Sequence, residues 1–261
     1  MKTKTLLLVM SLGFVLPTSA VELTVDEIVQ KANVAAYYQG EDGKASVRMT
    51  ITDKKDQTRD RQFNILRKDV EDGGDQFYFV YFKRPNDVRK MAYLVHKKVG
   101  KDDDRWLFLP DLSLVNRIAA GDKRTSFVGS DFLYEDVSGR GLEEDTHTLL
   151  ETTETQYIVK NVPKDPGAVE FNTYTVAIDR ATFVPMKMEF FDKADTLYRT
   201  IETQEVQTIQ GFATVTKSLV KDLKSGSQTE MVFSDVQYDL GLKADLFTER
   251  YLQRPPREAT R

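Results

Sequence analysis

Cysteine is absent from the chain, and this absence excludes several kinds of site. Without thiols the protein has no disulfide framework, no thiolate nucleophile and no metal site with cysteine ligands. Histidine occurs only twice, as His96 and His147, so no pair with i,i+4 spacing supports a zinc site. A chain of this length still buries enough apolar surface to fold without such crosslinks. We therefore expect neither a metal nor another cofactor.

An excess of positive charge is lacking as well. The first twenty residues have the pattern of a secretory signal peptide: Lys2 and Lys4, the apolar stretch TLLLVMSLGFVL, and small residues before a cleavage point after Ala20. Without this leader, 35 of the 37 basic residues remain against 41 acidic ones, a net charge of −6. That balance argues against nucleic acid and against adhesion to anionic lipid surfaces by charge. No apolar run has the length of a spanning helix, and no cysteine follows Ala20, so we expect an exported, soluble, periplasmic protein.

Motifs for catalysis are also scarce. No Gly-rich phosphate loop occurs, and VGSDF (128–132) lacks the second glycine of a serine nucleophile elbow. Ser130 is better interpreted as a helix N-cap, with Asp131 and Glu135 near the positive end of the helix dipole. Adjacent carboxylates are frequent, but most such runs are solvated turns. Because these motifs are missing, we expect a protein that is not an enzyme. A hydrolase would need two carboxylates that face each other across a cavity.

The first structured element predicted after the leader is an amphipathic helix. Thr24 is its expected N-cap, and Glu27, three residues later, completes a capping box. Gly40 marks its end. The apolar face, at helical spacing, consists of Val25, Ile28, Val29, Ala32 and Ala36.

Most of the remaining chain alternates as β-strands do. In ASVRMTI (45–51), for example, every second side chain is apolar. Short turns such as DKAD, IQG and KSGS join the strands, which predicts antiparallel pairing because parallel strands need long crossovers. We count eleven or twelve strands, which one curled sheet or an open barrel accommodates. No repeat or linker divides the chain, so residues 21–261 are expected to form a single domain.

Two segments interrupt the strand pattern. Residues 121–138, GDKRTSFVGSDFLYEDVS, predict a long loop with a short helix near residues 130–135. Residues from 253 onward, QRPPREATR, are expected to be a frayed tail. Before that tail, ADLFTERYL (244–252) predicts a short helix, whose inward-facing side chains would be Leu246, Phe247, Tyr251 and Leu252.

Two strands do not alternate. In QFYFVYF (76–82) and WLFL (106–109), the odd-numbered and the even-numbered side chains are both apolar. A strand with one wet face would alternate, so both faces of these strands must be covered. Either helices and loops of this chain cover both faces, or one face lines an apolar cavity for a ligand. Composition and periodicity leave both alternatives open.

Three stretches together resemble the outer-membrane lipoprotein-sorting, LolA-like family: WLFLP (106–110), RIAAGDKRTSF (117–127) and GSDFLYEDV (129–137). The leader, the first helix, the hairpin at 75–95 and the closing LGLKADLFTERYL (240–252) stand where that family would place them. The resemblance covers most of the chain. It is nearest to the branch associated with RND/MMPL-type exporters.

The resemblance implies a mainly β, unclosed antiparallel half-barrel with short helices plugging its concave face. The first helix and residues 121–138 would form the lid of an apolar hollow, with WLFLP in one wall. The underside of the lid would consist of Phe127, Phe132, Leu133 and Tyr134. The expected lining residues are Met49, Ile51, Phe63, Phe77, Phe79, Tyr81, Met91, Tyr93, Trp106 and Phe108. Arg117 and Arg124 are the candidates for an arginine that links cavity and lid.

The function that the resemblance implies is that of a monomeric carrier without catalysis. It would bind the acyl chains of a lipid, a lipoprotein or another hydrophobic ligand and pass them between membrane partners. An inner-membrane RND/MMPL-type transporter is one candidate partner. Two alternatives remain: a regulatory module that senses lipid or misfolded outer-membrane protein, and a periplasmic hydrolase with carboxylates at the cavity mouth.

Overall fold

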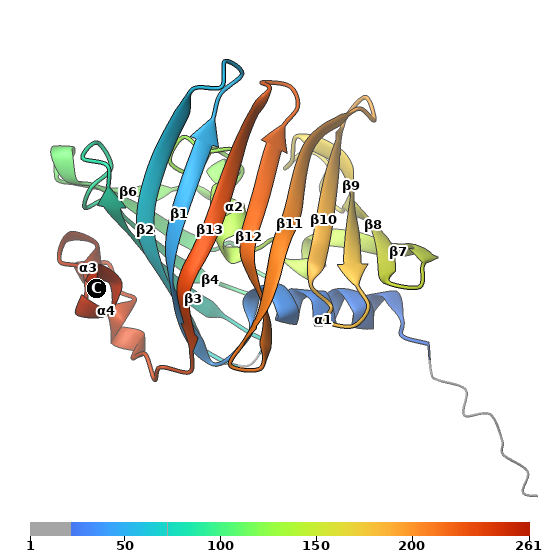
Figure 1. Ribbon diagram of the computed structural model, residues 1–261, viewed down its shortest axis with the longest axis horizontal. Helices are drawn as coiled ribbons and strands as arrows, with labels where there is room; N and C mark the ends of the chain where they lie inside the picture. The colour runs from blue at the N-terminus through green and yellow to red at the C-terminus, as the bar shows by residue number, and fades with distance from the viewer. Residues whose placement is uncertain (1–21, 72) are drawn as a thin grey trace, which may run out of the picture.

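The computed structural model describes residues 22–71 and 73–261, so the expected leader at 1–20 lies outside the described residues. One antiparallel sheet of thirteen strands dominates, in the order β6-β5-β4-β3-β2-β1-β13-β12-β11-β10-β9-β8-β7 (Figure 1). The mainly β half-barrel is confirmed, with one or two strands more than were counted in the sequence. The strands are β1 (Asp42–Thr52), β2 (Thr58–Asp69), β3 (Gln76–Arg84), β4 (Ala92–Lys97), β5 (Asp104–Leu109), β6 (Leu114–Ile118), β7 (Asp145–Thr152), β8 (Gln156–Pro163), β9 (Phe171–Asp179), β10 (Pro185–Asp192), β11 (Leu197–Ile209), β12 (Phe212–Asp222) and β13 (Ser227–Tyr238).

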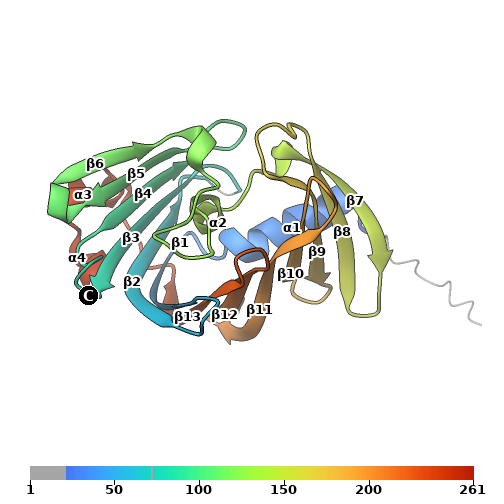
Figure 2. The ribbon, with the colours of Figure 1, turned by 90° about the horizontal axis from the view of Figure 1, so that it is seen from above.

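The sheet curls into an open arch, and its two edge strands, β6 and β7, lie apart (Figure 2). Helix α1 (Val25–Tyr37) crosses the concave side of the half formed by β7–β12, and α2 (Tyr134–Ser138) lies near the middle of the same side (Figure 2). Short 3-10 turns, η1 (Pro110–Leu112), η2 (Ala120–Asp122) and η3 (Leu142–Glu144), connect strands on the other part of the arch and near α2. None of the helices in the described part of the chain has the length and apolar character needed to cross a bilayer.

The N-terminal helix forms as its sequence predicts. The backbone N–H of Glu27 donates to the Thr24 hydroxyl at 3.3 Å, and the N–H of Thr24 donates to the Glu27 carboxylate at 2.8 Å, which completes the capping box. Ile28, Val29 and Ala32 are buried against apolar side chains of β8 and β9. This packing anchors α1 across one half of the concave side.

The segment at 121–138, here called the lid, is mostly loop and closes over the other half. Its helix, α2, begins at Tyr134, four residues later than expected, and Ser130 is not its N-cap. The N-cap is Leu133, whose N–H donates to the Asp136 carboxylate at 2.7 Å. Ser130 instead donates its hydroxyl to the Phe127 carbonyl at 2.7 Å, because the loop turns back on itself at this point.

The C-terminal segment, here called the outer cover (residues 240–261), packs on the convex side of β2–β5 and contains η4 (Ala244–Leu246), α3 (Arg250–Gln253) and α4 (Arg257–Thr260) (Figure 1). Phe247, Leu252 and Ala259 are almost completely buried. The expectation of a frayed tail from 253 is therefore wrong. The side chain of Asn64 donates to the carbonyls of Ala259 and Arg261, at 2.9 and 2.8 Å, and fixes the tail on β2.

Candidate functional site

The concave side of the sheet holds an open cavity of about 430 Å³, here called the hollow. α1, the lid and the inner faces of β2, β3 and β8–β13 contribute to its wall. The volume is in the range of small-molecule binding sites. Several apolar side chains of the wall are only half-buried, because no other part of the described chain covers them; these are Ile65, Met188, Ile201 and Phe233.

The lid covers the part of the concave side that the hollow does not occupy. The ring of Phe127 is completely buried, and its centroid lies 5.8 Å from that of Phe82 and 5.5 Å from that of Tyr93. Phe132 and Tyr134 are buried in the same cluster, as expected for the underside of a lid. Leu133 is half-buried and stands outside the apolar clusters, because it occupies the N-cap position of α2.

Half of the predicted lining residues lie on the concave side. Phe63 lines the hollow directly. Met49, Ile51, Met91 and Tyr93 belong to the same apolar cluster but are buried beneath the lid, out of contact with the hollow.

The other five predicted lining residues lie on the opposite side of the sheet, and this part of the prediction is wrong. They pack against Leu252 and Phe247 of the outer cover. The rings of Phe247 and Phe77 stack, with 5.8 Å between their centroids. The inward-facing residues of β3 are instead the even-numbered ones, Tyr78, Val80 and Phe82. Both faces of β3 and β5 are apolar because each has its own cover within the chain. The misassigned residues are Phe77, Phe79, Tyr81, Trp106 and Phe108.

The two candidate arginines occupy different environments. The side chain of Arg117 is 67% exposed on β6, pairs with Asp104 and does not line the hollow. Arg124 lines the hollow and links the lid to the wall: its Nε and Nη2 donate to the Glu170 carboxylate at 2.8 and 2.6 Å. Its guanidinium also lies 4.8 Å from the ring centroid of Phe171. Of the two candidates, Arg124, itself part of the lid, is the one that lines the hollow.

A buried carboxylate at the start of α2 organises the charges around Arg124. Glu135 is 2% exposed and forms salt bridges with Lys123, Arg124 and Arg140. Burial acts to raise the pKa of Glu135, but the three neighbouring positive charges outweigh it and hold that pKa below its ordinary value. Burial also acts to raise the pKa of Glu170, but the hydrogen bonds and charge of Arg124, with a further hydrogen bond from the Tyr198 hydroxyl, lower that pKa to about 2.

Two further arginines that hold the lid were missed in the sequence. Arg199 of β11 donates to the Asp131 carbonyl at 3.2 Å and pairs with Asp136, while its guanidinium lies 5.2 Å from the Phe190 ring centroid. Arg61 of β2 donates its Nε to the Val128 carbonyl at 3.1 Å. A signal for Arg199 was present, because LYRTI places an arginine on the same strand face as two apolar residues.

The condition for a hydrolase is not met among the described lining residues. The carboxylates that line the hollow are Glu135 and Asp136, neighbours on the lid helix that are each paired with an arginine. They do not face each other across the cavity. Within residues 22–71 and 73–261, no group of three or more metal-ligating side chains comes together.

Solved structures with the same fold bear on this site. The chain superposes on a DUF1329 family protein from Desulfovibrio piger with a TM-score of 0.79 and 28% identity, covering 88% of this chain and 97% of the other. A domain classed with outer membrane lipoprotein-sorting proteins, from Vibrio parahaemolyticus, gives a TM-score of 0.80 and 26% identity over 87% and 97% of the two chains. A LolA superfamily protein from Nitrosomonas europaea, 19% identical over 88% and 100% with a TM-score of 0.69, shows the shared fold.

The open sheet, the crossing helix and the lidded hollow thus define a LolA-like half-barrel, and the resemblance seen in the sequence is confirmed. Residues 74–254 match the model of a family described only as uncharacterized-protein-like, and the chain belongs to that family. A comparison with curated proteins found no match.

Proposed function

We propose that the protein is a monomeric periplasmic carrier that holds the acyl chains of a lipid or lipoprotein in the hollow and passes them between membrane partners. The observation that carries this proposal is a lidded cavity of about 430 Å³ with half-buried apolar walls. Each methylene moved from water into such a space gains about 0.8 kcal/mol. A bound acyl chain would complete the burial of Met188, Ile201 and Phe233, which this chain alone leaves unfinished.

The mechanism that we propose is reversible burial without catalysis. The lid rests on an aromatic underside and on polar links from Arg61, Arg124 and Arg199. When the lid opens, water can replace the partners of these hydrogen bonds. The free-energy difference between the open and closed states is therefore smaller than it would be for a lid held by apolar contacts alone. A ligand then shifts the balance by its own contacts with one of the two states.

The proposed site of action is the periplasm. The leader pattern at 1–20 and the similarity to a domain classed with outer membrane lipoprotein-sorting proteins support the periplasm. Because the sequence resembles the branch associated with RND/MMPL-type exporters, we propose such an inner-membrane transporter as donor or acceptor. Native and denaturing mass spectrometry of the protein, purified from periplasm without detergent, would separate a lipid cargo from a lipopeptide by mass.

Filling the hollow tests the proposal directly. Ala36 and Val34 are both exposed residues of α1, but Ala36 lines the hollow and Val34 does not. Binding of a fluorescent long-chain fatty acid to Ala36→Trp should weaken roughly tenfold or more, since losing room for about two methylenes costs about 1.6 kcal/mol. Val34→Trp, the matched control, should bind as the unaltered protein does. Full affinity in Ala36→Trp would show that acyl chains do not occupy the hollow.

A further inference from the structure

One edge of the molecule carries a charge opposite to that of the chain as a whole. Residues 83–90, at the end of β3 and in the β3–β4 turn, and residues 250–261, in the outer cover, contain eight basic and two acidic side chains. We call these two segments the basic face. Its one acidic turn residue, Asp87, is already paired with Arg61, at 3.2 Å. None of its eight basic side chains forms a salt bridge to another described residue. Their charge is therefore available to a partner.

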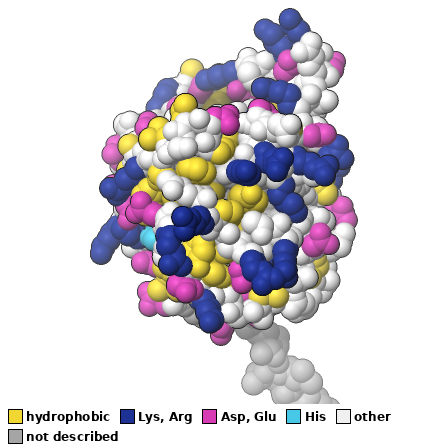
Figure 3. All heavy atoms as spheres, turned by 90° about the vertical axis from the view of Figure 1, so that its left-hand side faces the viewer, with side chains coloured by type: hydrophobic (Ala, Val, Ile, Leu, Met, Phe, Trp, Pro, Cys, Tyr) yellow, Lys and Arg dark blue, Asp and Glu magenta, His cyan; other side chains and the backbone are white. Residues whose placement is uncertain are grey.

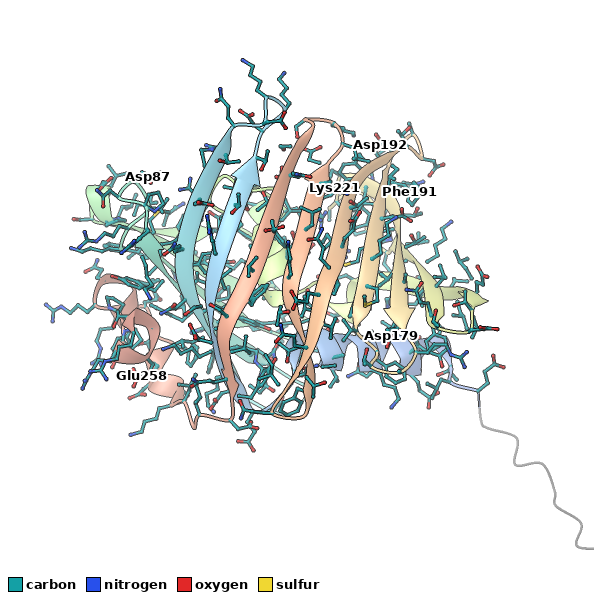
Figure 4. All side chains as sticks on the ribbon, in the orientation of Figure 1. Asp87, Asp179, Phe191, Asp192, Lys221 and Glu258 are labelled. Carbon is teal, nitrogen blue, oxygen red and sulfur yellow. The ribbon has the colours of Figure 1, made fainter. Side chains whose placement is uncertain are left out.

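The two segments of the basic face lie along the same edge of the molecule (Figure 4). α4 packs against β2 and β3, and Asp87 and Glu258 stand at the same edge of the molecule (Figure 4). Burial lowers the pKa of Lys44, and the nearby charges of Lys83 and Arg261, one from each segment, lower it further. Seen from this side, Lys and Arg side chains gather around apolar surface over α3, α4 and the adjoining strands (Figure 3).

An exposed apolar hairpin tip adjoins the basic face. Strand pairing aligns Tyr81 with Ala92 and Ala92 with Phe108, so the β3–β4 turn and the β5–β6 turn emerge at the same end of the sheet. At the β5–β6 tip, Leu112 is 69% and Leu114 47% exposed. Large aliphatic side chains held out on a tight turn stabilise nothing within the described chain.

We propose that the basic face and this leucine tip dock on an anionic lipid surface, with phosphate headgroups between the basic side chains and the leucines at the acyl boundary. The net charge of −6 argued against such adhesion, but the charge is distributed unevenly. An acidic protein surface would satisfy the basic residues yet gives no reason for two projecting leucines, whereas basic residues with an apolar wedge suit the membrane interface. Docking deepens the proposed carrier function, and rests on it, because it brings the hollow to the source of its cargo.

Vesicle binding tests the docking surface. The processed protein should cosediment with vesicles of phosphatidylglycerol and phosphatidylcholine, bind pure phosphatidylcholine much more weakly, and lose binding as salt is raised. Arg84→Gln/Arg89→Gln should reduce partitioning by more than tenfold, because each basic side chain near an anionic surface contributes roughly fivefold, about 1 kcal/mol. The control Lys31→Gln/Lys160→Gln removes the same charge from α1 and β8 and should leave partitioning unchanged. Leu112→Ser/Leu114→Ser should weaken binding without changing its salt dependence.

The outcomes separate this inference from the carrier function. Ala36→Trp should bind vesicles as the unaltered protein does, since it fills the hollow and leaves the basic face intact. Absence of binding to anionic vesicles, or an equal loss in both double charge variants, would overturn membrane docking by the basic face. Fatty-acid binding would stand in either case.

Discussion

The concave and convex sides of this sheet are both covered by the chain, but the two covers are held in different ways. On the convex side, Phe247, Leu252 and Ala259 are 1%, 0% and 0% exposed, and apolar packing secures the outer cover. On the concave side, the lid combines one fully buried ring, Phe127, with buried ion pairs, and it adjoins a hollow of about 430 Å³. The convex side of the sheet is thus closely packed, whereas the concave side keeps a cavity.

The difference separates two uses of aromatic residues that look alike in the sequence. The outer aromatics have the close packing of a protein interior, where the loss of a side chain leaves a cavity that the surroundings cannot fill. The inner aromatics of the lid, Phe127, Phe132 and Tyr134, sit on a segment that is mostly loop, and in the proposed carrier they would move together when the lid opens. We therefore expect substitutions on the convex side to act on global stability, and those on the concave side to act on lid opening and ligand binding.

The largest expected effect is on the outer cover. Phe247→Ala should lower the free energy of unfolding by about 3–5 kcal/mol, the usual cost of truncating a buried phenylalanine. Trp106 lies in the same apolar cluster, so its fluorescence during urea denaturation reports the change. Leu240→Ala, an exposed position in the same segment, is the control and should have little effect. Weaker fatty-acid binding in folded Phe247→Ala would contradict a purely structural role for this cover.

An intermediate effect is expected for the lid. Phe127→Ala should destabilise the closed lid and speed amide hydrogen exchange in residues 121–138. The free energy of global unfolding should fall by only about 1–2 kcal/mol, because the loss cannot exceed the free energy of opening the lid locally. Leu133→Ala, on the same loop but outside the core cluster, should exchange almost as the unaltered protein does. Exchange that rises equally in the sheet strands would show that the lid is an inseparable part of the core.

The smallest expected effect is that of acid. The folded-state pKa values of Glu135 and Glu170 lie below their ordinary values, that of Glu170 at about 2. Their contribution is therefore present above about pH 4.5 and is lost as the pH falls toward 2. Because Glu170 is half-exposed, we expect a weakening of the lid by about 1 kcal/mol.

Lid opening in acid should precede any change in Trp106 fluorescence, because Trp106 lies on the other side of the sheet. Glu170→Gln, which removes one of the titrating carboxylates, should reduce the pH dependence of exchange in residues 121–138, measured after correction for the intrinsic rate. If fluorescence and lid exchange change together between pH 4.5 and 2, the two covers are not independent.

Local signals explain which parts of the fold and site were predictable. The capping box at Thr24 and Glu27 depends on neighbours in sequence, and so does the apolar underside at Phe127 and Phe132. By contrast, the face of β3 that turns inward depends on the register with β2, in which Phe63 pairs with Phe82. With apolar residues on both faces, periodicity carries no information about that choice.

The tail and the arginine links show the same limit. Residues 253–261 are polar and rich in proline, yet hydrogen bonds from Asn64, nearly two hundred positions away, hold them on the sheet. The role of Arg199 depends on Asp136, which only the folded lid brings to it. An arginine at an apolar position of a strand was visible in the sequence, but its partner was not.

The strand order has a consequence for how the chain reaches this structure. Neighbours in the described sheet are consecutive in sequence except at one seam, where β1 pairs with β13 and Val47 lies opposite Phe233. Two meanders of local hairpins can therefore form early and independently, whereas the seam must close a loop of almost the whole chain, which is the slow kind of contact. Until β13 has formed, β1 keeps an open edge that can pair with another chain, and closing the seam removes this one route to strand-to-strand aggregation.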